Sequence, residues 1–507
     1  MEKRYVLAVD QSTQGTKAIL FNQEGALISR SDLAHRQLID EKGFISHDLD
    51  EIYKNTVQVV KNVVEKAGID REEIACLGIS NQRETSAAWS RSTAEPLAPA
   101  IVWQCARAKE ICERVKKNVI LDPSREQGKN GGVAEIIRQK TGMYLSAYFP
   151  AAKYAWLQEN VEAVKQAKKE NDLCLGTIDT WLVYKLTKGA VYATDYSNAS
   201  RTQLFNIHTL QWDKEVCTWF GIDEKILPVV CDSSFCYGTT DLEGYFSKPV
   251  PIGGVIGDSQ GALFGQGCLK RGMVKATYGT GSSVMMNVGT SPVCSDLGLV
   301  TSLAWGMDGK VSYVLEGNIN YTGAVITWLK DEMGFIQSPK ETEELALSAN
   351  KNDTTYLVPA FSGLGAPYWK ADAKAMIYGM SRTTGKKELV KAALESIAYQ
   401  ITDIVEMMRA EDGIEIKELC VDGGPTGNEY LMKYQSDILE TVVSLPGCEE
   451  SSALGAALLA GLCSGIYKRE SIFRNAKRNQ FLPSMPKAVR DQKYRGWKEA
   501  VERVMMK

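Results

Sequence analysis

Three short turns rich in glycine and threonine each follow an apolar run that predicts a β-strand. They comprise residues 12–16 (STQGT), 279–283 (GTGSS) and 423–424 (GG). Backbone N–H groups of glycine turns can approach phosphate oxygens closely because no side chain intervenes, and threonine hydroxyls add further donors. Each turn alone would also fit an ordinary hairpin. Three of them in one chain favour a site that binds the phosphates of a nucleotide.

Two aspartates stand where predicted strands meet such turns. Asp10 ends the apolar run 5–9, and Asp258 follows the run 251–257. Either residue could simply initiate a turn. A carboxylate beside bound phosphates could also hold Mg²⁺ or accept the proton of an attacking hydroxyl. The chain has no G-x-x-x-x-G-K-[ST] sequence, which excludes a P-loop, and its three histidines lack a second ligand at metal spacing. Phosphoryl transfer is therefore favoured over zinc or histidine chemistry.

The elements that position these residues occur twice. Residues 5–9 and 17–21 predict two strands joined by the first turn, and residues 26–29 predict a third. Residues 274–278 and 284–288 repeat the strand–turn–strand unit around the second turn. Two copies of one unit indicate a duplicated α/β architecture with two domains. Three further elements are predicted after the second unit: a helix over 394–408, a strand over 418–421 and a helix over 428–439.

Size and charge limit the classes of function. A chain of 507 residues is too long for one hydrophobic core, so we predict domains over residues 1–265 and 266–507. The composition, 44% hydrophobic and 24% charged, is typical of a globular enzyme. The formal charge of −3 leaves no basic surplus to neutralise a nucleic-acid backbone, so nucleic acid is not expected as a partner.

Nothing in the sequence predicts export or membrane insertion. The apolar run at the N-terminus stops at Asp10, which is too short for a signal peptide. The most apolar late stretch, residues 453–466, falls short of the roughly 20 residues that a membrane span needs. The 12 cysteines are scattered without a C-x-x-C pair, which is typical of reduced thiols. We therefore predict a cytoplasmic protein with no membrane partner.

Several motifs together resemble the FGGY carbohydrate kinases, and they occur in collinear order over nearly the whole chain. They are Asp10-Gln11-Ser12-Thr13 with Lys17-Ala18, Gly257-Asp258, Tyr278-Gly279-Thr280-Gly281, Asp422-Gly423-Gly424, and the longer patterns at 148–157 and 375–395. The resemblance implies a two-domain ATPase fold of the hexokinase and actin type with an interdomain cleft. It also implies that the chain uses ATP and Mg²⁺ to phosphorylate a hydroxyl of a small polyol or sugar.

Within the family, the chain is most similar to the glycerol kinase branch. The similar stretches are residues 81–85, 100–105, 194–202 and 358–369. This resemblance implies conversion of glycerol to glycerol 3-phosphate in carbohydrate and glycerol metabolism, by a homo-oligomer that we expect to be a dimer.

Carried over position by position, the resemblance implies roles for individual residues. Asp258 would accept the proton of the attacking hydroxyl and would share Mg²⁺ with Asp10. The substrate would be bound by Arg83, Glu84, Tyr148, Asp258 and Ser259, with Trp103 against its carbon side. The nucleotide would be bound by Thr13, Gln14, Gly15, Lys17, Thr280, Gly323, Thr327, Gly424 and Asn428.

Elementary chemistry allows these roles without requiring them. An adjacent arginine and glutamate, such as Arg83 and Glu84, offer both donors and acceptors to a polyol. The same pair would also fit a solvated surface. Trp103 could be the wall of a ligand pocket or part of the core.

Four positions depart from the glycerol kinase pattern. Ser259 replaces a glutamine that follows the catalytic aspartate, and Ser283 replaces a phenylalanine in the second phosphate turn. The first turn ends more like that of a xylulose kinase, and Thr327 replaces a glutamine on the nucleotide side. The two serines remove bulk from the implied pocket, so the alternative substrate is a larger polyol or ketose such as a tetritol, xylulose or ribulose. Residues 118–134 also form a longer connection than usual.

Two other classes share this fold. A sugar sensor without catalytic activity needs no proton acceptor, so Asp258 argues against it. An actin- or chaperone-like ATPase has a protein partner and no polyol pocket, so the set Arg83, Glu84, Trp103 and Tyr148 argues against it.

Overall fold

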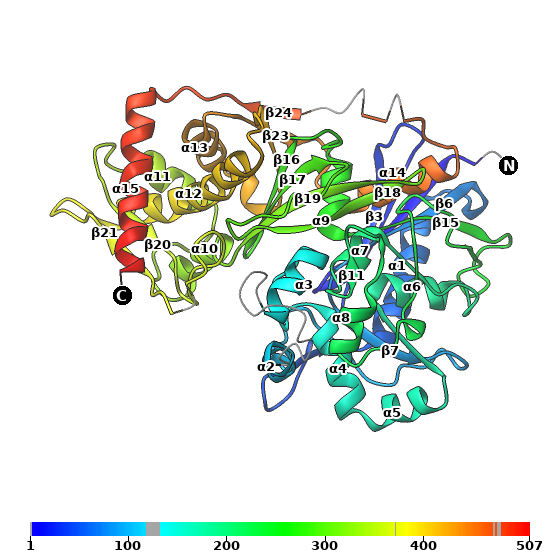
Figure 1. Cartoon of the computed structure of the whole chain (residues 1–507). Helices are drawn as coiled ribbons and strands as arrows, with labels where there is room; N and C mark the ends of the chain where they lie inside the picture. The colour runs from blue at the N-terminus through cyan, green and yellow to red at the C-terminus, as the bar shows by residue number, and fades with distance from the viewer. Residues whose placement is uncertain (1–2, 118–131, 371, 470–471, 474–477, 507) are drawn as a thin grey trace.

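Two mixed β-sheets organise the chain, one in each half (Figure 1). The computed structural model describes residues 3–117, 132–370, 372–469, 472–473 and 478–506. Most of the segment predicted to be a long connection, 118–134, lies outside the described residues; its last part begins helix α3 (Val133–Thr141). We call the part up to helix α9 (Asp258–Gly265) the first half, and the part from strand β16 (Val274–Tyr278) onward the second half.

The first half contains a six-stranded sheet and a five-stranded sheet beside it. The order in the six-stranded sheet is β14 (Thr239–Thr240), β15 (Val250–Gly257), β6 (Ile74–Asn81), β1 (Tyr5–Gln11), β2 (Gly15–Phe21) and β3 (Leu27–Ala34). The order in the five-stranded sheet is β4 (Leu38–Ile39), β5 (Ile45–His47), β8 (Ala100–Ile101), β7 (Ser86–Ser90) and β9 (Leu173–Thr177).

The second half is built around a seven-stranded sheet. Its order is β18 (Val300–Met307), β19 (Lys310–Ile319), β17 (Ser282–Gly289), β16, β22 (Glu418–Asp422), β23 (Val442–Pro446) and β24 (Arg478–Phe481). Three short two-stranded sheets complete the β-structure of the described residues: β10 (Ala193–Asp195) with β13 (Val229–Cys231), β11 (Phe205–Asn206) with β12 (Gln211–Trp212), and β20 (Tyr356–Val358) with β21 (Met376–Tyr378).

The two large sheets repeat one topology. In the first, β1 pairs antiparallel with β2, β2 antiparallel with β3, β1 parallel with β6, and β6 parallel with β15. In the second, β16 pairs antiparallel with β17, β17 antiparallel with β19, β16 parallel with β22, and β22 parallel with β23. The predicted duplication is therefore confirmed. The carboxyl ends of β1, β6 and β15, and those of β16 and β22, carry the predicted site residues.

Helices cover the sheets of both halves. In the first half they are α1 (Leu49–Ala67), α2 (Lys109–Lys117), α3, α4 (Pro150–Asn160), α5 (Glu162–Lys169), α6 (Ile178–Leu186), α7 (Tyr196–Ser200), α8 (Lys214–Trp219) and α9. In the second half they are α10 (Gly323–Asp331), α11 (Glu341–Leu347), α12 (Lys386–Asp412), α13 (Glu429–Leu439), α14 (Ser451–Cys463) and α15 (Lys487–Met505). The predicted helices over 394–408 and 428–439 correspond to α12 and α13, and the predicted strand over 418–421 to β22.

Helix α14 belongs to the second half in sequence but packs on the first sheet, as the orange helix beside β6 in Figure 1 shows. Glycines allow this close approach. A Cβ atom on Gly78 of β6 would lie 2.3 Å from the carbonyl oxygen of Ala456, and one on Gly455 would lie 2.0 Å from the carbonyl oxygen of Gly261 in α9. The two halves thus share packed elements, and the boundary at 265/266 stays a prediction.

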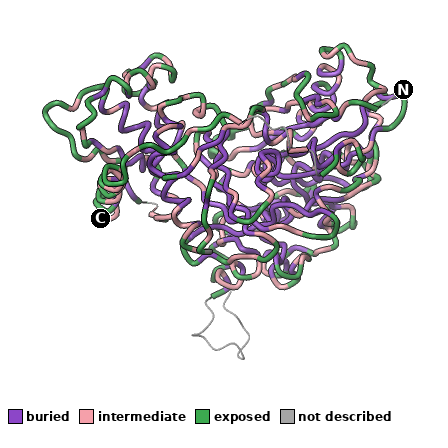
Figure 2. Tube along the Cα trace, turned by 90° about the horizontal axis from the view of Figure 1, so that it is seen from above, coloured by how far each residue is buried: buried purple, intermediate pink, exposed green. Residues whose placement is uncertain are grey.

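A shared hydrophobic cluster joins the two halves. It combines side chains from β1 and β2 with others from α9, β18 and α14, and Figure 2 shows buried segments in purple through both halves and the region between them. Burial of this cluster stabilises the packing of the two halves against each other, because apolar area removed from water contributes about 25 cal/mol per Å². None of the described helices combines the length and the apolar character that a membrane crossing requires.

Candidate active site

Asp10 lies at the end of β1, where the first Gly/Thr turn begins. Its Oδ1 accepts a hydrogen bond of 2.8 Å from the Ser80 hydroxyl on the neighbouring strand β6. Burial raises the pKa of Asp10 to about 6, although Lys17 and the Ser80 bond act in the opposite direction; the charge of Asp258 raises it further. Strand ends from β1 and β15 therefore bring the two predicted carboxylates within electrostatic reach of each other.

Asp258 is the first residue of α9, directly after β15. Its Oδ1 accepts the backbone N–H of Ser259 at 2.7 Å and lies 3.2 Å from Nε of Arg83. Its Oδ2 receives no hydrogen bond from any residue that the structure describes, and 37% of the side chain is exposed. One oxygen is thus held by the protein, while the other is open to a ligand. That is the arrangement which a proton acceptor needs.

Arg83 is buried and belongs to an ionic network that spans both halves. Its Nη1 and Nη2 donate to Glu316 of β19 at 3.1 and 3.0 Å. Arg201, from the first half, donates to the same Glu316 at 2.7 Å and to Glu84 at 2.5 Å. The predicted pair Arg83-Glu84 is therefore not a solvated surface pair: the two side chains are only 6% and 2% exposed.

Glu316 is the charge that balances this network. Burial alone would raise its pKa, but Arg201 and Arg83 outweigh burial and hold the pKa of Glu316 at about 2. The hydroxyl of Ser283 donates to Oε1 of Glu316 at 3.1 Å. Two arginines and two glutamates thus neutralise one another, which leaves Asp258 as the additional negative charge beside Arg83. The neutralised cluster fixes the direction of the Arg83 fork.

Glu84 adopts a backbone φ of +61°. Such a left-handed conformation is uncommon for a residue other than glycine and costs on the order of 1–3 kcal/mol. The ion pair with Arg201 holds the Glu84 side chain, and the Ser86 hydroxyl donates to the Glu84 carbonyl at 3.1 Å. The surrounding contacts therefore hold this conformation in the short connection between β6 and β7.

Two aromatic side chains flank the network. The rings of Trp103, after β8, and Tyr148, just before α4, lie 5.5 Å apart and are tilted by 58°. Burial raises the pKa of Tyr148 far above its usual range, and the charge of Glu84 adds to this effect. Nε1 of Trp103 donates to the Thr13 hydroxyl at 2.9 Å. Trp103 thus links the aromatic pair to the first Gly/Thr turn. Its role is therefore more than that of a side chain packed in the hydrophobic core.

Backbone contacts bring together the second half's predicted nucleotide residues. The N–H of Gly323 donates to the carbonyl of Gly279 at 2.8 Å, and a Cβ on Gly323 would lie 2.5 Å from that oxygen. Gly423 has a φ of +100°, and a Cβ there would lie 2.0 Å from the Tyr278 carbonyl oxygen. The turns at 279–281 and 423–424 and the start of α10 therefore form one compact edge.

The remaining predicted nucleotide residues occupy different environments. Gln14, Thr280, Thr327 and Gly424 are exposed, whereas Gly15 is packed against the Leu33 carbonyl. Lys17 forms an ion pair of 2.9 Å with Glu450, the residue just before α14, whose side chain makes no capping hydrogen bond to that helix. Asn428 caps α13: its side-chain oxygen accepts from the Leu431 N–H at 2.9 Å, and its amide donates to Thr342 at 3.1 Å.

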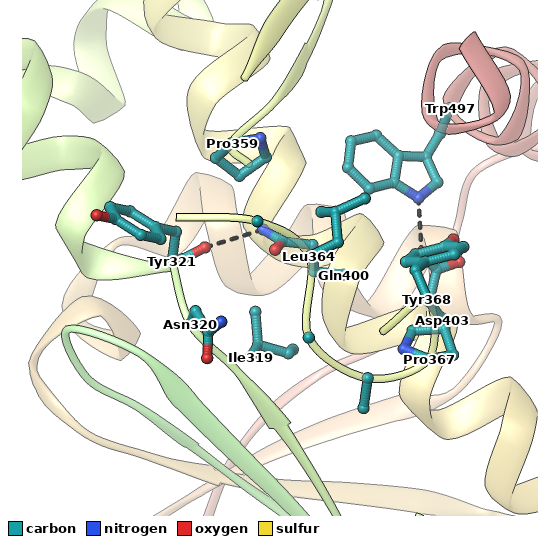
Figure 3. Close-up of a pocket in the computed structure, with 13 residues that line it drawn as sticks. Ile319, Asn320, Tyr321, Pro359, Leu364, Pro367, Tyr368, Gln400, Asp403 and Trp497 are labelled. Carbon is teal, nitrogen blue, oxygen red and sulfur yellow. Dashed lines mark hydrogen bonds between the residues drawn. The ribbon is translucent and has the colours of Figure 1, made fainter. Parts of the chain in front are cut away.

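A small pocket behind this edge shows how α12 and α15 support it (Figure 3). Gln400 of α12 donates to the Tyr321 carbonyl at 3.0 Å and so fixes the segment before Gly323. Asp403, one turn farther along, accepts from Trp497 of α15 at 2.8 Å and from Tyr368 at 2.7 Å. The cavity measures about 10 Å³, enough for no more than one water, so we assign it to packing rather than to ligand binding.

Models of one protein family match both halves of the chain. They are the N-terminal domain of the FGGY family of carbohydrate kinases over residues 5–265 and the C-terminal domain of that family over residues 274–463. The chain belongs to the FGGY family of carbohydrate kinases. It is an enzyme of the phosphotransferase class, and the resemblance predicted from the motifs is confirmed.

Individual relatives extend this result. The carbohydrate kinase is 46% identical over 504 residues to a glycerol kinase of Caldanaerobacter subterraneus, which covers 99% of each chain. It is 46% identical over 503 residues to glycerol kinase 1 of Thermotoga maritima, again with 99% of each chain. A crystal structure of Plasmodium falciparum glycerol kinase with ADP superimposes with a TM-score of 0.90 at 34% identity, covering 100% of this chain and 99% of the other. The predicted two-domain ATPase fold is confirmed.

Three buried charges of this carbohydrate kinase site had no predicted role: Arg201, Glu316 and Lys153. Arg201 and Lys153 lie inside stretches that resemble the family, and Glu316 follows the apolar run 313–315. A charged residue inside an apolar strand is a signal in itself, because burying a charge without a partner is costly. The charged partners of Arg201 and Glu316, however, lie more than 100 positions away in sequence, and Lys153 binds main-chain carbonyls instead.

The structure also shows the surroundings of Ser259 and Ser283, the two serines that replace larger residues of the glycerol kinase pattern. The Ser283 hydroxyl is occupied by Glu316, whereas the Ser259 hydroxyl, beside Asp258, has no partner among the described residues. Of these two serines, Ser259 alone presents, within the described part of the chain, a free hydroxyl next to the proposed proton acceptor.

Proposed function

We propose that this carbohydrate kinase transfers the γ-phosphoryl group of ATP to a terminal hydroxyl of a small polyol, with glycerol as the first candidate. The observation that carries the proposal is the Asp258 carboxylate, which has one oxygen held by Arg83 and one open, next to the Trp103–Tyr148 pair. The full-length similarity to glycerol kinases supports glycerol, and the ADP-bound relative supports an adenine nucleotide.

The proposed mechanism uses the site mainly for positioning. Arg83 and Glu84 would bind hydroxyl groups of the polyol, while Trp103 and Tyr148 would face its C–H groups. Asp258 would accept the proton of the attacking hydroxyl through Oδ2. The turns at 12–16 and 279–281 would hold the phosphates by backbone N–H groups, together with Thr13 and Thr280. Positioning and electrostatics account for most of the catalysis in phosphoryl transfer.

Asp10 and Asp258 would hold Mg²⁺ in this mechanism. Within the described ranges, no three His, Cys, Asp or Glu side chains gather into a metal site. A pair of carboxylates nevertheless fits, because Mg²⁺ in kinases commonly binds one or two carboxylates and completes its shell with phosphates and water. Bound there, the ion would neutralise charge that develops on the phosphates. The raised pKa of Asp10 agrees with a carboxylate whose balancing positive charge would be supplied by the bound Mg²⁺.

A larger polyol or ketose is the second candidate substrate, and Ser259 is the observation that favours it. Its free hydroxyl and short side chain leave room and a hydrogen-bond partner beside Asp258, where the glycerol kinase pattern has a glutamine. Discrimination through hydrogen-bonded hydroxyls can be large. A homodimer, a cytoplasmic location and the absence of nucleic-acid and membrane partners stay predictions.

An assay of ADP release over a panel of compounds tests the proposal. The panel contains glycerol, a four-carbon and a five-carbon polyol, xylulose and ribulose, each with ATP and Mg²⁺. We expect turnover that requires a polyol or ketose together with Mg²⁺. Preference for glycerol supports the first candidate, and preference for a longer compound supports the second. Equal ADP release with and without every compound would contradict the proposed function.

A further inference from the structure

Lys153 is a buried charge that the proposed mechanism does not use. It lies in the first turn of α4 and is fully buried, which is rare for a lysine without a specific partner. Its ammonium donates to the main-chain carbonyl of Trp103 at 3.2 Å and to the main-chain carbonyl of Tyr148. One side chain thus binds the backbones of the two residues whose rings flank the site.

These two contacts join segments that are far apart in sequence. Trp103 follows β8 of the five-stranded sheet, and Tyr148 precedes α4. Nζ of Lys153 also lies 5.9 Å from the centre of the Tyr148 ring. Because Trp103 in turn donates to Thr13, the chain of contacts runs from Lys153 through the aromatic pair to the first Gly/Thr turn. Loss of the ammonium would release both backbone segments at once.

The charges around Lys153 are mixed. The nearby charge of Glu84 favours the ammonium form, as do the thiols of Cys105 and Cys112 to a lesser extent, whereas the cation Arg107 disfavours it. Burial lowers the pKa of Lys153 to about 7, and Glu84 acts against this shift. The ammonium is therefore present below neutral pH and is lost progressively above it. A charged donor makes a stronger hydrogen bond than a neutral amine.

We propose that Lys153 is a positioning residue that sets the separation and tilt of the Trp103 and Tyr148 rings and thereby the fit of the polyol. The inference rests on the proposed function, because it treats the aromatic pair as the wall against the substrate's C–H groups. Lys153 does not touch the substrate. It acts on polyol binding and leaves the nucleotide residues of the second half untouched.

Three substitutions separate positioning from general stability. Lys153→Met removes the donors at similar length, and Lys153→Gln keeps N–H donors without a charge. Lys391→Met is the matched control, since Lys391 is also buried, at 7% exposed, and donates to the Asn350 carbonyl in the second half. We expect Lys153→Met to raise the polyol KM by about 10–100-fold, the scale of a misplaced binding group, and to change the ATP KM less than about threefold. The polyol KM of Lys153→Gln should lie between those of Lys153→Met and the wild type. Lys391→Met should leave the polyol KM unchanged.

The pH profile gives a readout that a purely structural lysine would not move. In the wild type we expect the polyol KM to rise as pH increases through about 7, because the ammonium is then lost. In Lys153→Met this step should be absent. The proposal would be overturned if Lys153→Met had the polyol KM of the wild type at every pH and differed from the wild type only by a lower Tm.

Crystal structures keep the inference testable if the wild type phosphorylates nothing in the panel. That result would contradict the proposed function. The distance between the Trp103 and Tyr148 rings could still be compared between the wild type, Lys153→Gln and Lys153→Met. We expect the 5.5 Å separation and the 58° tilt to change in the variants. Rings that stay in place in Lys153→Met, or in Lys153→Gln where the methionine variant does not fold, would overturn the role of Lys153.

Discussion

The two sides of the proposed site are built by different means. On the substrate side, Arg83, Glu84, Arg201 and Glu316 are at most 6% exposed and are locked to one another by ion pairs. On the nucleotide side, Gln14, Thr280, Thr327 and Gly424 are exposed, and the turns are held by backbone hydrogen bonds. Side chains define one side, and backbone conformation defines the other.

The chemistry of the two ligands explains this difference. A polyol carries no charge, so only hydrogen bonds in a fixed geometry distinguish it from water and from its homologues. A triphosphate carries its own charge and can be bound by N–H groups of any suitably shaped turn. Substitutions on the substrate side should therefore alter specificity and stability together, whereas those on the nucleotide side should alter affinity for ATP modestly.

The largest effect is expected at Asp258, where the two sides meet. Asp258→Asn keeps the size of the side chain and its contact with Arg83 but cannot accept a proton. We expect kcat to fall by roughly 10²–10⁴-fold, the usual contribution of a general base, with ADP affinity within about threefold of the wild type. Steady-state kinetics and calorimetric ADP titration measure both quantities. Near-normal turnover would remove Asp258 from the mechanism.

Glu316 tests the ionic network of the substrate side. Glu316→Gln removes the negative charge that Arg83 and Arg201 share. Arg201 keeps its pairing with Glu84, and Arg83 keeps its pairing with Asp258, but breaking a buried ion pair still costs about 3–5 kcal/mol. Because the folded protein lowers the pKa of Glu316 from 4.5 to about 2, this stabilisation is present above pH 4.5 and is lost as pH falls toward 2. Urea unfolding at several pH values should therefore show a difference from wild type that shrinks in acid.

The matched control for Glu316 lies on the nucleotide side. Glu343 accepts the backbone N–H of Glu429 at 3.3 Å and has no buried cation to balance among the residues that the structure describes. Glu343→Gln should change the free energy of unfolding by less than about 1 kcal/mol at every pH. A similar loss in both variants would mean that the two sides are not built differently.

The same contrast explains what the sequence could predict. The strand–turn–strand units and Asp10 and Asp258 at strand ends are local patterns, so 5–9, 17–21, 274–278 and 284–288 correspond to β1, β2, β16 and β17. The Arg83–Glu316 ion pair joins residues 233 positions apart, and no local pattern encodes it. Arg83 with Glu84 could equally have been a surface pair until Glu316 and Arg201 were placed beside them. The sequence therefore predicts turns well and buried ionic networks poorly.

Ser259 and Ser283 test whether the substrate side has been enlarged. We expect Ser259→Gln combined with Ser283→Phe to raise the ratio of kcat/KM for glycerol over a four-carbon polyol by roughly 5–150-fold, since an unpaired buried polar group costs about 1–3 kcal/mol. Ser283→Ala is the necessary control, because Ser283→Phe also removes the hydrogen bond to Glu316. A ratio that moves equally in Ser283→Ala would assign the effect to that bond, and an unchanged ratio in the double variant would contradict an enlarged pocket.

The smallest effect is expected at Asn428, where a predicted nucleotide contact is also a helix cap. Both ends of its side chain are occupied, by the Leu431 N–H and by Thr342. Asn428→Ala should lower stability by about 1 kcal/mol, as loss of a cap does, and raise the ATP KM by up to about fivefold. Asn428→Ser keeps a capping oxygen, so its ATP KM should stay within about twofold of the wild type. If the serine variant instead loses as much ATP affinity as the alanine variant while keeping its stability, the Asn428 amide binds the nucleotide directly, and side chains define part of the nucleotide side after all.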